Sequence, residues 1–247
     1  MGADSLMNAH MGPESRTAAE VLLRVSHVGV EFDGKVIFQD LNFELREKET
    51  LSILGPNGAG KTVLLRALLG LVPCRGHVSW RAGVRIGYVP QRIPLNKELP
   101  VTVADFFSMK RAAPKDVAGL LSQVGIMDSD FLERQLGVLS SGQFQRVLIA
   151  WALINNPNVV LFDEPTAGID IGGEETIHTL LRRTQADRNI ALILVTHDLS
   201  IGYEQATNVL CLNNRTSCYG PPSQILKAEV LQEIYGSDVK FYRHAHE

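Results

Sequence analysis

The pattern of apolar and polar residues over the first third of the chain favours β-strands. Residues 21–32 (VLLRVSHVGVEF), 35–45 (KVIFQDLNFEL) and 49–54 (ETLSIL) are rich in β-branched and aromatic residues. Asp33 and Gly34, between the first two stretches, are typical of a turn. An antiparallel sheet is therefore predicted near the start of the chain.

A different apolar spacing begins after this region. Residues 62–70 (TVLLRALLG) carry leucines at helical spacing, and Gly70 suits the left-handed end of a helix. Residues 84–90 form a predicted strand that Pro90 closes, whereas residues 91–130 are more polar and have helical periodicity. We interpret this change as an inserted helical subdomain.

Strand and helix patterns alternate over the second half of the chain. Predicted strands at 158–162 (NVVLF) and 190–196 (IALILVT) flank a predicted helix at 174–186 (EETIHTLLRRTQA). Continuous apolar strands that alternate with helices are typical of a parallel sheet buried on both faces. Residues 223–236 (SQILKAEVLQEIYG) are predicted to form one helix near the end of the chain.

The composition excludes several classes of function. The formal net charge is −3 with both signs mixed along the chain, so no basic surface is expected for nucleic acid. Three cysteines without a CxxC pair fit a reducing, cytoplasmic compartment. The apolar runs are far shorter than the roughly 20 residues of a membrane-spanning helix, and residues 1–20 are predicted to be a flexible tail without the apolar block of a secretory signal.

Residues 55–62 form a glycine-rich loop, GPNGAGKT, between an apolar strand and a helix. Glycines let successive backbone N–H groups point at anionic oxygens, and the start of the following helix favours the same charge. Lys61 adds a positive charge near the outer phosphates, and the Thr62 hydroxyl suits Mg²⁺. A chance glycine turn is the alternative, but the strand before and the helix after favour nucleotide binding.

Two acidic residues, Asp163 and Glu164, end the apolar strand in VVLFDEP, where open α/β sheets hold their ligands. Adjacent residues at a strand end point in different directions. Asp163 is predicted to hold Mg²⁺ through its water shell, and Glu164 to orient or deprotonate the water that attacks the γ-phosphate. The alternative is a solvated turn before Pro165. His197 follows a second apolar strand and is predicted to contact the γ-phosphate, with a structural histidine as its alternative.

The motifs and their order along the chain resemble those of the ABC-type ATPases over residues 21 to about 220. The resemblance rests on the phosphate loop, Gln91 in YVPQR, the signature LSSGQ at 139–143, the acidic pair, Asp170 in AGID and His197. It implies an α/β fold with three parts: a P-loop (RecA-like) core with a parallel sheet, an N-terminal antiparallel β-subdomain and an inserted α-helical subdomain.

The resemblance also implies domain bounds. After the tail, residues 21–247 form one nucleotide-binding domain. Its helical subdomain spans about 92–150, and a C-terminal helix and tail span about 221–247.

ATP and Mg²⁺ are the cofactors that the resemblance implies. Thr62, Gln91 and Asp163 are implied to hold Mg²⁺, and Glu164, His197 and Gln91 to act in catalysis. Phe32 is expected to stack on adenine, and its alternative is a core aromatic on an edge strand. The residues implied to bind the nucleotide are Phe32, Gly55, Pro56, Asn57, Gly58, Ala59, Gly60, Lys61, Thr62, Val63, Ser140, Ser141, Gly142, Gln143 and Asp170.

In this family the signature amides meet the γ-phosphate of ATP bound to the opposite subunit, so the resemblance implies a homodimer of nucleotide-binding subunits. The sequence departs from the family at three positions. Ser141 replaces the usual glycine with a small side chain, and activity is expected to survive. Val63 stands where serine or threonine is more usual and is expected to be neutral. Trp151 replaces a common arginine, and the sequence offers no reason for it.

One nucleotide-binding domain without membrane spans implies separate integral-membrane permease subunits, docked near Gln91, and a peripheral place on the cytoplasmic face of the inner membrane. LPVTV, DEPTAGID, VLCLNNRTSCYGPP and YRHAHE resemble the metal-ion importers, most like the zinc type. An extracytoplasmic metal-binding protein is then an indirect partner. His244 and His246 are either a weak Zn²⁺ site or a solvated terminus, and Cys211 and Cys218 are predicted to flank a hairpin turn.

Several rival functions stay open at this point. An ABC ATPase for manganese, iron chelate or lipid transport shares all of the chemistry and differs in its cargo. A soluble ABC ATPase of DNA repair or translation is disfavoured because the chain lacks a basic stripe and a second nucleotide domain. A nucleotide-gated regulatory module is disfavoured by Glu164 and His197.

Overall fold

Two β-sheets are the framework of the computed structural model, which describes residues 19–91, 93, 100–165, 171–196, 199, 205–213 and 217–235. The first is a three-stranded antiparallel sheet of order β2-β1-β4. Its strands are β1 (Val21–Phe32), β2 (Lys35–Arg46) and β4 (Arg75–Trp80). The predicted antiparallel sheet is confirmed for residues 21–32 and 35–45, as is the turn at Asp33 and Gly34. Residues 49–54 do not belong to it, because β3 pairs parallel with two strands of the second sheet.

The second sheet has six strands in the order β5-β6-β7-β3-β8-β9. All neighbouring pairs are parallel except β8 and β9, which form an antiparallel hairpin. The strands are β3 (Thr50–Leu54), β5 (Ile86–Val89), β6 (Val159–Asp163), β7 (Ala191–Val195), β8 (Asn208–Leu212) and β9 (Ser217–Gly220). Strands β6 and β7 are buried along their whole length, as their continuous apolar sequences predicted, and β3 is buried in the same way.

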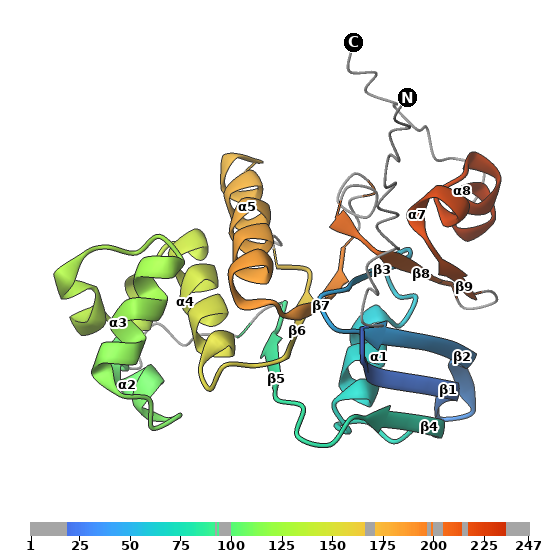
Figure 1. Ribbon diagram of the computed structural model, residues 1–247, viewed down its shortest axis with the longest axis horizontal. Helices are drawn as coiled ribbons and strands as arrows, with labels where there is room; N and C mark the ends of the chain where they lie inside the picture. Colours follow the sequence, from blue (N-terminus) through green and yellow to red (C-terminus); the bar gives the residue numbers. More distant parts are fainter. Residues whose placement is uncertain are drawn as a thin grey trace, which may run out of the picture.

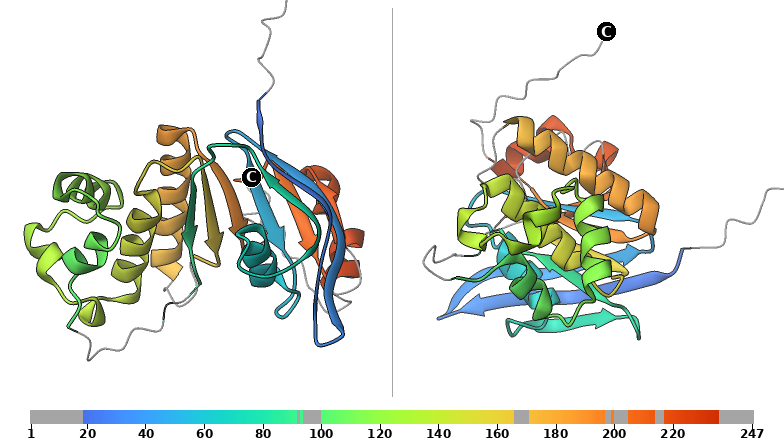
Figure 2. Two further views of the ribbon diagram at one scale, coloured as in Figure 1. Left: turned by 90° about the horizontal axis from the view of Figure 1, so that it is seen from below. Right: turned by 90° about the vertical axis from the view of Figure 1, so that its left-hand side faces the viewer.

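Helices cover the six-stranded sheet on both faces. Helix α1 lies between the two sheets, whereas α2, α3 and α4 lie beyond β5 and β6 on the other side (Figure 1, Figure 2). Two short 3₁₀ turns, Ser129–Glu133 and Leu136–Val138, precede α4. The helices are α1 (Lys61–Leu68), α2 (Val103–Ser108), α3 (Pro114–Gln123), α4 (Ser141–Leu153), α5 (Ile171–Arg188), α7 (Pro222–Ile225) and α8 (Ala228–Tyr235).

Three apolar cores follow from this layering. The first, around Leu64 of α1, fills the space between the two sheets. The second, around Phe162 of β6, joins the sheet to the helical part and to α5. The third is small and packs the C-terminal helices against β8. The sheets and helices together confirm the predicted fold class, an α/β P-loop core with an antiparallel β-subdomain and a helical insertion.

The prediction of one helix over residues 223–236 is wrong. Helix α7 ends at Ile225, and Leu226 leaves the helical conformation with ψ 42° before α8 begins. Ile225 and Ile234 both pack in the third core. Nine residues correspond to about two and a half helical turns, so on one straight helix these side chains would point to opposite sides. The break lets both reach β8.

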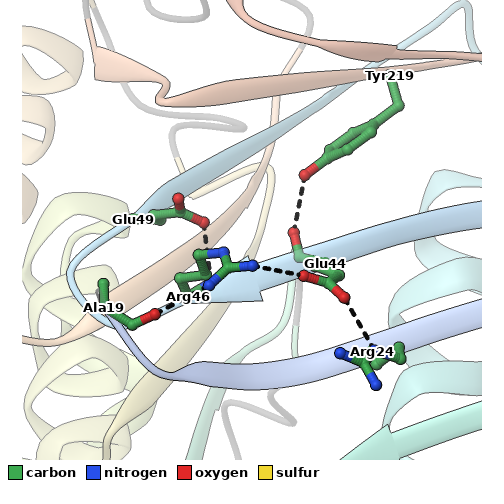
Figure 3. Close-up of polar contacts among 6 residues, drawn as sticks. All are labelled: Ala19, Arg24, Glu44, Arg46, Glu49 and Tyr219. Carbon is green, nitrogen blue, oxygen red and sulfur yellow. Dashed lines mark hydrogen bonds and ion pairs between the residues drawn. The ribbon is translucent and has the colours of Figure 1, made fainter. Parts of the chain in front are cut away.

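A seam of polar contacts joins the two sheets at β2 and β9 (Figure 3). The Tyr219 hydroxyl donates to the Glu44 carbonyl oxygen at 3.0 Å. The Glu44 carboxylate accepts from Arg24 Nε at 2.9 Å and from Arg46 Nη2 at 3.0 Å, and Arg46 Nη1 donates to the Ala19 carbonyl at 3.0 Å. The contact between Arg46 and the Ala19 carbonyl thus ties the first described residue to β2. The predicted domain bounds stay a prediction.

Candidate nucleotide-binding site

The loop between β3 and α1 is shaped by its glycines. Gly55 passes so close to β8 that a Cβ atom there would lie 2.1 Å from the Leu212 carbonyl oxygen. Gly60 has φ +93°, and a Cβ atom on it would lie 2.5 Å from the Ile37 side chain. Both the left-handed backbone and the close approach therefore require glycine at these positions.

The start of α1 is left open for an anion. Gly60 is the N-cap residue and has no side chain to accept from the first-turn N–H groups, and the first turn carries no acidic residue. Unsatisfied N–H groups at a helix start carry a partial positive charge that suits phosphate oxygens. The local structure therefore fits the predicted phosphate cradle. Within it, Asn57 is exposed, whereas Ala59 is buried.

The Lys61 ammonium lies inside this loop with only 6% of the side chain exposed. It donates to the carbonyl oxygens of Gly55 at 2.8 Å and Pro56 at 3.1 Å. Its Nζ atom also lies 3.7 Å from Glu164 Oε1. Burial lowers the pKa of Lys61, and the nearby Glu164 carboxylate opposes that shift. A buried cation is thus held at the mouth of the glycine loop.

Asp163 lies at the carboxyl end of β6, facing α1. Thr62 Oγ1 donates to its Oδ1 atom at 3.0 Å, and the Tyr88 hydroxyl donates to its Oδ2 atom at 3.3 Å. Burial raises the pKa of the Asp163 carboxyl, and the two hydrogen bonds oppose that shift. Sequence reasoning missed Tyr88. The signal was present in the alternation of β5, because Tyr88 pairs with Leu161, two residues before Asp163 on the same face of β6.

Glu164 has partners different from those of Asp163, as expected for neighbouring residues at a strand end. Its backbone has φ +47°, and its N–H donates to the Val195 carbonyl at 3.1 Å. The Glu164 carboxylate accepts from Gln91 Nε2 at 2.6 Å. The structure therefore brings Gln91, Lys61 and Glu164 into one chain of contacts at the carboxyl edge of the sheet.

The signature residues lie elsewhere, at the start of α4. Ser140 Oγ accepts from the Gln143 N–H at 3.2 Å, and the Gln143 side chain accepts from the Ser140 N–H at 3.0 Å. This reciprocal capping box satisfies the N–H groups of Ser140 and Gln143, and the N–H groups of Ser141 and Gly142 lie outside it. Ser141 is exposed, and a Cβ atom on Gly142 would meet no atom within 4 Å. Among the described residues, no hydrogen bond joins this segment to the glycine loop.

Two other predicted nucleotide contacts are described. Phe32 ends β1 with 41% of the residue exposed, so its ring is available at the surface and is not the core aromatic of the alternative reading. Val63 is half-buried and packs in the core between the sheets, where an apolar side chain fits. Asp170 and His197, together with His244 and His246, lie outside the described residues.

Trp151 now has a structural explanation. Its indole stacks on Phe106 with ring centroids 4.1 Å apart and an interplanar angle of 26°. Lys110 Nζ lies 4.8 Å from the indole centroid and donates to the Trp151 carbonyl at 2.9 Å. Trp151 therefore fixes α2 and the residues after it onto the last turn of α4.

Other candidate sites are limited in the described part of the chain. Cys211 and Cys218 face each other across the β8–β9 hairpin, as predicted. The described residues contain no group of three or more His, Cys, Asp or Glu side chains that could hold a metal ion. Among them there is also no helix that is both long and apolar enough to cross a membrane.

Comparison with known proteins defines the class of this chain. The family model described as ABC transporter matches residues 38–167, more than half of the 247 residues. The matched region holds the glycine loop, Gln91, the signature residues and the acidic pair. The chain belongs to the ABC transporter family, and its ATP-binding domain makes it an ATPase.

Particular relatives extend the likeness to nearly the whole chain. The Zinc import ATP-binding protein ZnuC of Cereibacter sphaeroides is 39% identical over 229 residues, covering 90% of this chain and 93% of the relative. ZnuC of Haemophilus influenzae is 37% identical, covering 91% of this chain and 85% of the relative. A metal-chelate type ABC transporter, solved in an inward-facing conformation, superposes with a TM-score of 0.78 at 28% identity, covering 87% of this chain and 88% of that chain.

Proposed function

We propose that this chain is the ATP-hydrolysing subunit of an importer for a divalent metal ion, zinc, and that it acts by ATP-driven dimerisation coupled to a separate permease. The observation that carries the chemistry is the convergence of Lys61, Thr62, Asp163, Glu164 and Gln91 at one edge of the sheet. The cargo is supported by relatives that are named for zinc import and match about nine tenths of the chain.

The glycine loop binds the phosphates of ATP in this proposal. The uncapped start of α1 supplies N–H donors, and the Lys61 ammonium supplies the charge. In the structure Lys61 contacts two loop carbonyls and Glu164. Phosphate oxygens are stronger acceptors for a cation than neutral carbonyls, so the phosphates of bound ATP replace the loop carbonyls as acceptors of the Lys61 hydrogen bonds. Phe32, exposed at the end of β1, supplies the flat face for adenine.

Thr62 and Asp163 fit the magnesium of bound ATP. A threonine hydroxyl and a carboxylate are oxygen donors of the kind that Mg²⁺ prefers, and here they contact each other directly at 3.0 Å. Mg²⁺ bound at this place neutralises phosphate charge. Gln91 supplies a further amide oxygen from the end of β5, because its Nε2 atom is the one that contacts Glu164.

Glu164 is the group that orients and deprotonates the attacking water. Gln91 fixes one carboxylate oxygen at 2.6 Å, and Lys61 lies 3.7 Å from the other. A carboxylate held on both sides is positioned for general-base catalysis once the Lys61 ammonium contacts the phosphates instead. Gln91 also begins the segment that leads to the helical part, so the same contact links hydrolysis to the permease dock. His197 and Asp170 keep their predicted roles beside the γ-phosphate and the nucleotide.

The catalytic site is completed by a second copy of the chain. Ser140, Ser141, Gly142 and Gln143 lie at a helix start that has its own caps and an unobstructed outer surface at Gly142. The N-terminus of α4 therefore suits the γ-phosphate of ATP bound to the partner. Hydrolysis then separates the two copies.

The transport partners follow from the family and from the relatives' names. Integral-membrane permease subunits hold the dimer at the cytoplasmic face of the inner membrane, and an extracytoplasmic metal-binding protein delivers the cargo. Nucleic acid is not a partner in this proposal. A metal chelate is the second candidate cargo, because a metal-chelate type transporter has a closely superposing ATPase chain.

Glu164→Gln tests the catalytic proposal. The amide keeps the size of the carboxylate but cannot take a proton from water. We expect ATP binding to persist, turnover to fall by at least about 100-fold and an ATP-dependent dimer to accumulate, measured by phosphate release and by light scattering. Normal turnover would remove Glu164 from the mechanism, and a variant that stays monomeric with ATP would remove the proposed dimer.

The cargo is tested with the complete transporter. The chain is co-purified with its native permease, reconstituted into vesicles and assayed for ATP-dependent uptake of Zn²⁺, Mn²⁺ and an iron chelate in parallel. Uptake of Zn²⁺ in preference to the others is expected. Uptake of the chelate alone would favour the second candidate, and recovery with an exporter or with ribosomes would overturn the import proposal.

A further inference from the structure

Tyr88 contacts Asp163 of the acidic pair, although it belongs to none of the motifs identified in the sequence. Its hydroxyl lies 3.3 Å from Asp163 Oδ2, while Thr62 Oγ1 lies 3.0 Å from Oδ1 of the same carboxylate. Each oxygen of Asp163 thus accepts from one hydroxyl, one donated by β5 and one by α1. The Asp163 residue is only 1% exposed, so water does not substitute freely for either donor.

The position of Tyr88 follows from the register of the sheet. It pairs with Leu161, and side chains of paired residues on parallel strands lie on the same face. Asp163 lies two residues further along β6 and shares that face. The Tyr88 ring packs in the core between the two sheets, which fixes the direction of its hydroxyl. Because packing holds the ring, the hydroxyl offers Asp163 a hydrogen-bond donor at a fixed position.

We propose that Tyr88 is a positioning residue for magnesium: its hydroxyl holds Oδ2 of Asp163, so that the carboxylate keeps one orientation beside Thr62 when Mg²⁺–ATP binds. This inference rests on the proposed function. In this proposal Tyr88 acts through Asp163 and not by contact with the reacting atoms, and the Arg66 side chain is a second partner of its hydroxyl. Residues that hold a metal-binding carboxylate in place typically change metal affinity when they are removed.

The chemistry of the two groups fixes the direction of this contact. An ionised carboxylate only accepts hydrogen bonds, whereas a phenol can donate one, so the Tyr88 hydroxyl is the donor. A neutral donor holds the carboxylate without adding a charge that would compete with Mg²⁺.

Tyr88→Phe tests the proposal, because it removes one oxygen and keeps the ring in the core. The measurement is equilibrium binding of a fluorescent ADP analogue to the full chain, first in EDTA and then over a Mg²⁺ titration. We expect unchanged binding in EDTA and a rise of about 10-fold or more in the Mg²⁺ concentration at half-effect. An unchanged Mg²⁺ midpoint would overturn the inference.

Two further variants separate positioning from general loss of structure. Tyr219→Phe removes a hydroxyl that donates to the Glu44 carbonyl in the seam between the sheets, and its Mg²⁺ midpoint is expected to match the wild type. In an Asp163→Asn background, Tyr88→Phe is expected to cause no additional shift. An equal shift with and without Asp163 would show that Tyr88 acts through something else.

The failure of this inference is distinguishable from failure of the proposed function. If the wild-type chain shows no Mg²⁺-dependent nucleotide binding, the proposed nucleotide site itself is wrong. If the wild type responds to Mg²⁺ and Tyr88→Phe responds identically, only the role of Tyr88 is wrong. Thermal unfolding of each variant, followed by circular dichroism, accompanies the titrations so that a misfolded sample is recognised. The double variant of Tyr88→Phe with Asp163→Asn then decides between the two outcomes.

Discussion

Helices α1 and α4 both begin at a glycine-containing segment, but the two starts are built in opposite ways. At α1, Gly60 has no side chain to cap the helix, and the Ile37 side chain leaves no room for a Cβ atom there. At α4, Ser140 and Gln143 cap the helix reciprocally, and Gly142 has open space around it. The start of α1 has no side-chain cap, whereas at α4 two N–H groups are capped and those of Ser141 and Gly142 lie outside the capping box.

The difference between the two helix starts separates a glycine that the chain's own structure requires from one that it does not require. The reason for Gly60 lies inside the chain, in a left-handed φ and the nearby Ile37 side chain. No such reason exists for Gly142, since its φ is not positive and its surroundings are open. Glycine costs helix stability without a local benefit there. Its reason therefore lies outside the chain, and the proposed partner phosphate supplies one.

Gly60→Ala is expected to have the largest effect. A left-handed alanine costs roughly 1–2 kcal/mol, and the Ile37 side chain must move away from a contact of 2.5 Å. We expect the free energy of unfolding, measured in urea, to fall by about 1–3 kcal/mol. Nucleotide binding should be lost as well, because the N–H groups at the start of α1 change direction.

Gly34→Ala is the matched control for this variant. Gly34 also has a positive φ, of 75°, but nothing lies within 4 Å of a Cβ atom there, and it lies in the β1–β2 turn. We expect a similar strain cost and normal nucleotide binding. If Gly34→Ala abolished binding too, the loss in Gly60→Ala would reflect instability and not the phosphate cradle.

Gly142→Ala should change turnover and stability in opposite directions. Alanine is the better helix former, so the free energy of unfolding of the monomer is expected to rise by up to about 0.5 kcal/mol. Steady-state ATP hydrolysis is expected to fall by about tenfold or more, equivalent to roughly 1.4 kcal/mol in the barrier. The fall occurs because the added methyl separates the helix start from the partner's γ-phosphate.

Gly119→Ala in α3 is the control for helix propensity. Gly119 is exposed, has no atom within 4 Å of a Cβ position and lies away from the signature residues in sequence. We expect a stability gain of about 0.5–1 kcal/mol and unchanged turnover. Full activity in Gly142→Ala would mean that the space above Gly142 is not used.

Asp163→Asn tests the cost of a charge buried beside α1. Burial raises the pKa of Asp163 in the folded chain above its unfolded value. The stability that this group contributes is present at pH below the unfolded pKa and is lost as pH rises through the folded pKa. Asparagine is neutral throughout, so without nucleotide or Mg²⁺ its melting temperature should gain on the wild type as pH rises from 4 to 7.

Asp163→Asn should also lose Mg²⁺-dependent hydrolysis. A gain in stability together with this loss would show that the buried charge serves function at a cost to the fold. Buried charges that weaken a fold are common where function requires them. A constant difference in melting temperature across this pH range would show that Asp163 ionises as freely in the folded chain as in the unfolded one.

The sequence predicted the contiguous parts of the site and failed at contacts made across the fold. The glycine loop and the acidic pair are short motifs whose backbone conformation is local, so their residues were all identifiable. Tyr88 and Asp163 are 75 positions apart, and only the register of β5 on β6 brings them together. The break at Leu226 is likewise set by packing on β8, which overrides a continuous helical pattern.

Trp151→Arg is expected to have the smallest effect on nucleotide binding, because the last turn of α4 serves the chain's own packing. Arginine, the residue common in the family, loses the stacking on Phe106 and brings a second cation next to Lys110. We expect the free energy of unfolding to fall by about 1–2 kcal/mol, with nucleotide affinity within about twofold of the wild type. Trp151→Phe keeps an aromatic ring against Phe106 and should recover most of that stability. If Trp151→Arg instead weakened nucleotide binding as strongly as Gly60→Ala, the last turn of α4 would also serve the nucleotide. Its role would then not be limited to packing within the chain.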